Sequence, residues 1–261
     1  ENFYFAPLPL NLNQAQDIPH HIRMSWQQKM FIRRGFLLPI KQFQNHSFNI
    51  SFVHNGFICK IMKKYSEKVI GICHNDKPEQ FKHADCLICL SPNAVEKAKN
   101  SGRCEDSIYH LPHYFEPKKK TFNEIKTKQK LTIGAAGRFV DKKGFKIFID
   151  VAARIKEEFP EIDFVLAGDG PLSKSLRAFS KSRGSPVRFT GWTDVEKFAS
   201  SIDIFCLPSL DEPFGYILPE MMQFGIAVVS SSTNGPLWIC KGNQNALFFE
   251  PSNDDEMLIC L

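Results

Sequence analysis

Two glutamates in one loop, Glu212 and Glu220, have the residue type and spacing to bind a ligand that carries hydroxyl groups. They stand eight positions apart in L-P-S-L-D-E-P-F-G-Y-I-L-P-E, residues 207–220, which follows an apolar strand-like run and leads into a helix-like run. Open α/β sheets bind ligands in such loops, between the carboxyl end of a strand and a helix. A carboxylate accepts two hydroxyl groups at once, and Gly215 lets backbone N–H groups approach an anion closely. The stretch therefore predicts a site for sugar hydroxyls beside an anionic group.

A second loop supplies the positive charge that an anionic ligand requires. Arg138 and Lys143 lie in G-R-F-V-D-K-K-G, residues 137–144, between a predicted strand and a predicted helix over 145–159. Two cations and the helix starts after Gly144 and Gly215 can neutralise a diphosphate without a divalent metal. No Asp-x-Asp pair occurs where a metal would be held. We therefore expect no metal and no other cofactor.

Short apolar runs alternate with helix-like stretches, which predicts successive βα units and parallel sheets. The predicted strands form two series, 48–53, 69–73, 85–90 and 107–111 in the first and 131–135, 164–167, 187–189, 202–207 and 227–229 in the second. We predict an α/β fold with two Rossmann-like parallel-sheet domains and a cleft between them, the first domain being incomplete. The predicted parts are an irregular arm (1–25), a partial first domain that opens with a helix over 26–43 (26–117), a Lys-rich linker (118–130) and a second, ligand-binding domain (131–261).

The composition is that of a soluble globular protein, with 43% apolar and 23% charged residues among 261. The chain contains no apolar run of about 18 residues that would predict a transmembrane helix, and its first residues lack the pattern of a secretory signal. Eight scattered cysteines favour a reducing cytosol. Cys86 and Cys89 lie within an apolar strand pattern, where residues three apart point to opposite faces. We therefore interpret them as strand residues and not as a redox or metal-binding motif.

Charge is distributed unevenly along the chain. Residues 1–120 contain 17 Lys and Arg against 10 Asp and Glu, a net +7, whereas the remainder contains 16 against 18, a net −2, which gives the overall +5. A basic first part favours a phosphorylated partner or an anionic membrane surface. Its cations are dispersed and lack interleaved aromatic residues, so binding of nucleic acid is disfavoured.

Four motifs, in order over residues 131–251, resemble the donor-binding domain of the retaining glycosyltransferases of family 4, which have the GT-B fold. The motifs are G-R-F-V-D-K-K-G at 137–144, L-A-G-D-G-P at 166–171, F-T-G-W at 189–192 and E-P-F-G-Y-I-L-P-E at 212–220. The last matches the family's E-x7-E signature. Four ordered motifs are more specific than any one of them alone.

The resemblance implies a hexosyl transfer, with retention, from a nucleotide-diphosphate sugar to a sugar or lipid-linked acceptor. It implies a cytoplasmic enzyme at the inner face of the membrane, and the basic first domain, on the acceptor side, favours a role in cell-envelope glycan or lipopolysaccharide synthesis. The implied roles are the transferred sugar for Glu212, a catalytic position near that sugar for His74, the diphosphate for Arg138, Lys143, Phe214 and Gly215, the ribose for Glu220 and the base for Gly191 and Trp192. Trp192 is equally compatible with a core position.

Three features depart from the family pattern. No Gly-Gly pair occurs before Gly134, the chain ends inside a helix predicted to start near Asp254, and Leu237-Trp238 stand where the family often has an acidic residue. We therefore expect a glycosyltransferase truncated at both ends. The alternative is a non-catalytic nucleotide-sugar-binding remnant of such an enzyme. An NAD-type oxidoreductase is disfavoured, because no G-x-G-x-x-G follows the first strand of either half.

Overall fold

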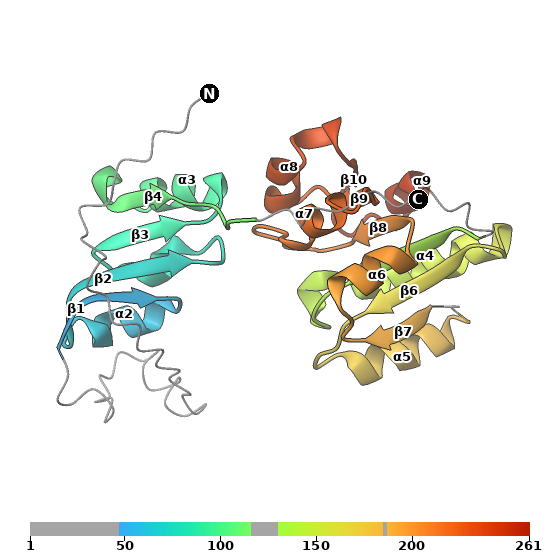
Figure 1. Ribbon diagram of the computed structural model, residues 1–261, viewed down its shortest axis with the longest axis horizontal. Coiled ribbons are helices and arrows are strands. Elements are labelled where there is room, and N and C mark those ends of the chain that lie inside the picture. The colour runs from blue at the N-terminus through green and yellow to red at the C-terminus, as the bar shows by residue number, and fades with distance from the viewer. Residues whose placement is uncertain (1–46, 116–129, 185–186) are drawn as a thin grey trace. The chain divides into compact units, whose positions relative to one another are not determined.

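The computed structural model describes residues 47–115, 130–184 and 187–261. All of them belong to one compact unit, residues 45–261. The predicted arm, the helix predicted over 26–43 and nearly all of the predicted linker lie outside the described residues. The described residues form two parallel sheets, drawn as two sets of arrows in Figure 1.

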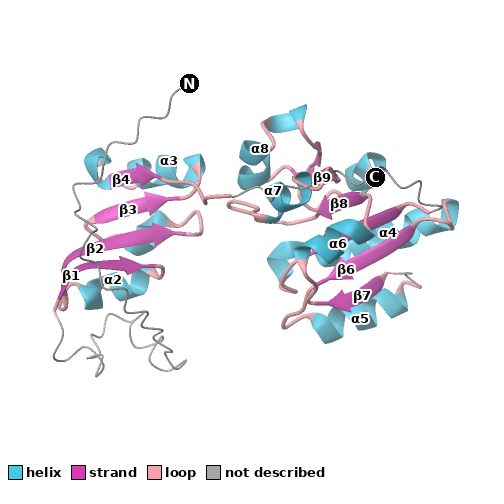
Figure 2. Ribbon diagram, viewed as in Figure 1, coloured by secondary structure: helices cyan, strands magenta, loops and turns pink. Residues whose placement is uncertain are grey.

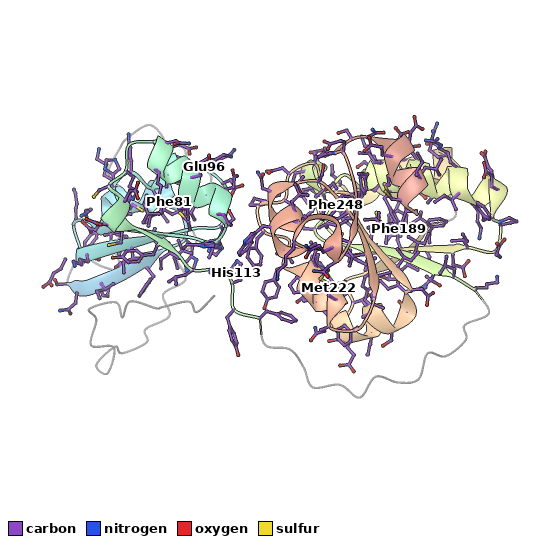
Figure 3. The ribbon with its side chains drawn as sticks, turned by 90° about the horizontal axis from the view of Figure 1, so that it is seen from above. Phe81, Glu96, His113, Phe189, Met222 and Phe248 are labelled. Atoms are coloured by element: carbon purple, nitrogen blue, oxygen red, sulfur yellow. The ribbon has the colours of Figure 1, made fainter. Side chains whose placement is uncertain are left out.

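The first sheet has four parallel strands in the order β1-β2-β3-β4. Strands alternate with helical segments along the chain, as Figure 2 shows by colour. The elements are β1 (Phe48–Val53), α2 (Gly56–Met62), β2 (Ser66–Cys73), η3 (Pro78–Phe81), β3 (Cys86–Cys89), α3 (Pro92–Asn100), η4 (Glu105–Ser107) and β4 (Ile108–His110). The side chain of Asn55 caps α2 and that of Ser91 caps α3. The buried ring of Phe81, labelled in Figure 3, would contact any side chain placed at Gly71 of β2.

The second sheet has six parallel strands in the order β10-β9-β8-β5-β6-β7. Its first half contains β5 (Thr132–Ala136), η5 (Asp141–Lys143), α4 (Phe145–Glu158), β6 (Asp163–Ala167), α5 (Ser173–Ser182) and β7 (Arg188–Gly191). Its second half contains α6 (Val195–Ser201), β8 (Ile204–Leu207), α7 (Ile217–Met222), β9 (Ala227–Ser231), α8 (Asn234–Ile239), η6 (Gly242–Gln244), β10 (Leu247–Phe249) and α9 (Asp254–Cys260).

The strand order places a topological switch point between β5 and β8. The chain builds outward from β5 to β6 and β7, and then returns to place β8 on the other side of β5. Ile133 pairs with Ile204 and Gly134 with Phe205 across this junction. Ligands of open α/β sheets bind outside the carboxyl ends of strands at such a point. The loops that follow β5 and β8 therefore define the place to look for a site.

Alternate residues of the central strands enter two separate apolar layers. Phe164 and Leu166 of β6 pack in the layer that contains α4, α5 and α9 side chains, whereas Val165 and Ala167 pack in the layer that contains α6 and α7 side chains. Partly buried Phe189 packs against the first layer and Phe248 against the second, and both are labelled in Figure 3. Both faces of this sheet are covered, as a parallel sheet requires.

Every predicted strand overlaps an observed one, with end points that differ by a few residues. The free cysteines Cys86 and Cys89 lie at the two ends of β3, and Cys89 is buried, which agrees with a strand interpretation. The short strand β10 and helix α8 were not predicted. Among the residues that the structure describes, no helix is long and apolar enough to span a membrane.

Candidate functional site

Lys143 and Glu212 form an ion pair at the switch point. The Lys143 ammonium group donates a hydrogen bond to Glu212 Oε2, and the two side chains are only 18% and 10% exposed. Lys143 ends the turn after β5, and Glu212 lies in the loop after β8. The sequence placed the two residues in separate loops after separate strands. The structure brings them together across 69 positions of chain.

Gly144 lets these two loops touch. Its φ of +66° is left-handed, and a Cβ atom at this position would lie 1.9 Å from the carbonyl oxygen of Pro208. The neighbouring backbone joins the same loops, because Leu210 N donates to Lys142 O at 2.7 Å. Gly144 also begins α4, so a tight backbone contact and a helix start coincide beside Lys143.

Buried serines hold Glu212 from behind. Ser209 Oγ donates to Glu212 Oε2 at 3.3 Å, and Ser231 Oγ of β9 donates to Ser209 O at 2.6 Å. Both serines are fully buried. Sequence reasoning did not select Ser209. Its position in L-P-S, directly after an apolar strand and three residues before the first glutamate, was the available signal.

Phe214 and Gly215 are fixed by the start of α8. Gly235 N donates to Glu212 O at 3.0 Å, and a Cβ atom at Gly235 would lie 2.3 Å from Phe214 O. The Trp238 ring packs edge-on against Phe214, with 5.7 Å between centroids. Gly215 has a φ of +85° and precedes α7. The departure from the family pattern at Trp238 therefore supports the loop that carries Phe214.

Arg138 has surroundings unlike those of Lys143. Its side chain is exposed, and the guanidinium has no hydrogen bond or ion pair with any residue that the structure describes. The next residue, Phe139, is buried and anchors the loop, and its N–H donates to Asp169 O at 2.8 Å. A Cβ atom at Gly168 would lie 1.9 Å from Gly137 O, so the Gly-Asp-Gly turn supports this loop from below. The arrangement leaves one fixed cation and one free cation beside the switch point.

The turn at Gly191 and Trp192 lies at the end of β7, outside the core. Gly191 has a φ of +72° and its carbonyl accepts a hydrogen bond from Gly168 N at 2.7 Å. Trp192 is 69% exposed, so the core alternative for this residue is wrong. Glu220 lies in the first turn of α7, after Gly215, and is partly buried. The predicted ribose and base residues thus occupy loop and helix-start positions.

Three histidine rings stack near the ends of the first sheet's strands. His74 Nε2 lies 2.6 Å from His54 Nδ1, and the His74 and His113 rings stack with 5.6 Å between centroids. His113 also contacts Phe214 edge-on at 4.9 Å. Partial desolvation, followed by the charges of His54 and His113, lowers the pKa of His74, and desolvation lowers that of His113. His54 ranked below His74 as a sequence candidate, yet it is the hydrogen-bond partner of that ring.

The described residues contain no group of three His, Cys, Asp or Glu side chains arranged to hold a metal ion. The polar groups that converge at the switch point instead comprise an ion pair, a free guanidinium and glycine-rich helix starts. Cations and backbone N–H groups suit an anion, and the carboxylates of Glu212 and Glu220 suit hydroxyl groups.

Known proteins with similar sequences are glycosyltransferases. Residues 116–259 match the family model described as glycosyl transferases group 1. A lipopolysaccharide core biosynthesis glycosyltransferase, LpsE of Rhizobium meliloti, is 28% identical over 65% of this chain and 51% of its own. A 2-deoxystreptamine N-acetyl-D-glucosaminyltransferase of Niallia circulans is 28% identical over 48% of this chain and 33% of its own.

Solved structures with the same arrangement are also glycosyltransferases or nucleotide-bound proteins. S. aureus TarM, in complex with UDP, Fondaparinux and alpha-GlcNAc-glycerol, has a TM-score of 0.71 at 17% identity over 81% of this chain and 47% of its own. Anabaena HepE, in complex with UDP and glucose, has a TM-score of 0.68 at 18% identity over 81% and 66%. The chain spans about half the length of the lipopolysaccharide glycosyltransferases that it matches. On its sequence motifs and its two parallel sheets, the chain belongs to the glycosyl transferases group 1 family and has the GT-B fold.

Proposed function

We propose that this protein transfers a hexosyl group, with retention, from a nucleotide-diphosphate sugar to a sugar or lipid-linked acceptor. The observation that carries the proposal is the partly buried Lys143–Glu212 pair at the β5–β8 switch point. It combines a cation for phosphate with a carboxylate for hydroxyl groups, at the place where this fold binds ligands. Membership of a glycosyltransferase family supports the same activity.

The diphosphate would be held by Lys143 and Arg138, together with backbone N–H groups of Phe214 and Gly215. The exposed Arg138 has no partner among the described residues, so its guanidinium is available for a bidentate contact with phosphate. The left-handed φ of Gly215 and the start of α7 after it favour N–H groups that face an anion. No metal is required in this proposal, because the protein supplies the positive charge.

Glu212 would accept hydroxyl groups of the transferred sugar, and Glu220 would accept those of the ribose. The exposed Trp192 and the turn at Gly191 would border the base. UDP and glucose in the similar HepE structure support this class of donor. His74 would face the transferred sugar from the other sheet, oriented by its hydrogen bond with His54.

In this reaction the bond between the sugar's C1 and the phosphate oxygen breaks, and its electron pair leaves with the diphosphate. The acceptor oxygen attacks C1 from the same face, which retains the configuration, and its proton passes to the departing phosphate oxygen. The protein contributes orientation and charge stabilisation. Lys143 and Arg138 stabilise the leaving group, while the Glu212 carboxylate favours positive charge on the sugar ring.

The acceptor is proposed from charge and relatives. The net +7 of residues 1–120 suits a phosphorylated or membrane-bound acceptor, and the similar LpsE acts in lipopolysaccharide core biosynthesis according to its name. We therefore propose an acceptor among cell-envelope glycan or lipopolysaccharide precursors. Such an acceptor favours the cytoplasmic, membrane-peripheral location that the sequence predicts.

A calorimetric screen of UDP-, GDP- and ADP-sugars tests the donor half of the proposal. We expect one nucleotide series to bind, and Lys143→Ala and Arg138→Ala to weaken that binding about tenfold each. Release of nucleoside diphosphate with a lipopolysaccharide precursor then tests transfer. Unchanged affinity in both variants would overturn the diphosphate assignment, and binding without any turnover would favour the non-catalytic alternative.

A further inference from the structure

The Lys143–Glu212 pair sets a condition on any diphosphate that enters the site. Both side chains lie mostly out of solvent, and the ammonium group already donates to Glu212 Oε2. Ser209 Oγ donates to that same oxygen atom. The empty site is therefore internally neutralised, with its carboxylate supplied with hydrogen-bond donors from the protein.

A phosphate that recruits Lys143 changes the surroundings of Glu212. The ammonium group either leaves the carboxylate or shares its three donors between two anions. In both cases a partly buried negative charge faces the diphosphate with less compensation than before. A buried charge that loses its partner is strongly unfavourable, and repulsion between two anions at short range adds to this effect.

An intact nucleotide sugar removes that penalty, whereas the bare nucleoside diphosphate does not. Sugar hydroxyl groups are donors, and the Glu212 carboxylate is acceptor-only, so the sugar replaces the hydrogen bonds that Lys143 withdraws. The diphosphate that remains after transfer brings no such donor. Its binding leaves Glu212 close to phosphate oxygens and without a new partner.

We propose that the Lys143–Glu212 ion pair makes this site discriminate between an intact nucleotide sugar and the nucleoside diphosphate that remains after transfer. Glu212 is the specificity-determining residue in this inference, and it acts by disfavouring the product. The inference rests on the proposed function, because it requires Lys143 to bind the diphosphate. Its consequence is that the sugar-free product dissociates readily and the site returns to its neutralised state.

Glu212→Gln tests the inference through binding of two kinds of ligand. Glutamine keeps the shape and an oxygen that can accept from Ser209, but it removes the negative charge and releases Lys143. The probes are UDP, GDP and ADP, and UDP-glucose, GDP-mannose and ADP-glucose, titrated by calorimetry. We expect the diphosphate of the series that binds to gain about tenfold in affinity in this variant. Its nucleotide sugar should bind no more tightly than to the unaltered protein.

Asp211→Asn is the matched control. Asp211 is exposed, precedes Glu212 in the same loop and carries the same charge. We expect this variant to change either affinity by less than about twofold, since exposed charges are well screened. An equal gain with Asp211→Asn would overturn the inference, because net charge and not the ion pair would then be responsible. Glu212→Ala provides the same test if the glutamine variant does not fold.

The outcomes separate the inference from the proposed function. If Lys143→Ala weakens diphosphate binding while Glu212→Gln shifts both ligand types equally, discrimination by Glu212 is wrong and the donor site stands. If none of the six probes binds the unaltered protein, or Lys143→Ala binds the diphosphate unchanged, the proposed function falls and the inference with it. Opposite responses of the two ligand types support both.

Discussion

Gly144 and Pro208 approach each other so closely that a Cβ atom on the glycine would lie 1.9 Å from the proline carbonyl oxygen. This contact joins the loop after β5 to the loop after β8, beside the Lys143–Glu212 pair. A backbone atom cannot move aside as the end of a flexible side chain can. The two site loops therefore share their backbone geometry.

Gly144→Ala should destabilise the protein by about 3 kcal/mol, because it adds a clash with backbone to a left-handed conformation. Chemical denaturation monitored by circular dichroism measures the change. Gly184→Ala is the control, since Gly184 also has a left-handed φ, +61°, but a Cβ atom there meets nothing within 4 Å. We expect it to lose only about 1 kcal/mol. Equal losses would mean that the contact with Pro208 has no effect on stability.

Ser209→Ala should lower turnover more than it weakens donor binding, because Ser209 orients Glu212 without reaching the ligand. We expect kcat to fall about tenfold while KM changes little. Stability should fall by about 1 kcal/mol through the lost hydrogen bond. Ser200→Ala, at an exposed position on α6, is expected to leave kcat, KM and stability unchanged. A rise in KM with unchanged kcat would place Ser209 in ligand binding instead.

Stability should fall as the pH is lowered from about 6.5, because the folded protein holds His74 and His113 with lowered pKa values. Below the unfolded pKa of about 6.5, the unfolded chain binds protons that the folded chain does not, so unfolding gains free energy from acid until the folded pKa is passed. Above pH 7 this dependence should be absent. Denaturation at pH 7.5, 6.5 and 5.5 measures it.

His74→Asn removes one of these groups and also relieves His113 of a stacked neighbour. We expect the loss of stability between pH 6.5 and 5.5 to be smaller in this variant than in the unaltered protein. An identical pH dependence in both proteins would show that the stacked histidines do not titrate in this range.

Trp192→Phe should leave stability within about 0.5 kcal/mol, since the side chain is 69% exposed. If the base stacks near this ring, nucleotide binding quenches part of the tryptophan fluorescence of the unaltered protein, and Trp192→Phe abolishes most of that quenching. Trp238→Phe keeps Trp192 and serves as the control. Quenching that persists in Trp192→Phe and disappears in Trp238→Phe would assign the base contact elsewhere.

The sequence was sufficient for the strands of both sheets, because apolar runs ended by Gly, His, Asn or Asp are local features. It placed Arg138, Lys143 and Glu212 in the correct loops. It did not reveal that Lys143 pairs with Glu212 while Arg138 remains free, because that difference depends on the contact between Gly144 and Pro208. Ser209 and His54 were missed or ranked low for the same reason, since their partners are brought near by the fold. The three-residue β10 is too short for a periodic pattern to identify.

The β5–β8 junction has a consequence for the order in which this protein folds. Its two strands are separated by the whole β6-α5-β7-α6 segment, and Thr132 N reaches Asp203 Oδ2 across it at 2.8 Å. Closing so long a loop is entropically unfavourable and slow relative to local contacts. Lys143 and Glu212 can meet only after this closure, so nascent chains should acquire nucleotide binding late, once β8 has emerged and docked. Recovery of ligand binding during refolding would then report completion of the sheet, lagging behind the recovery of helix signal.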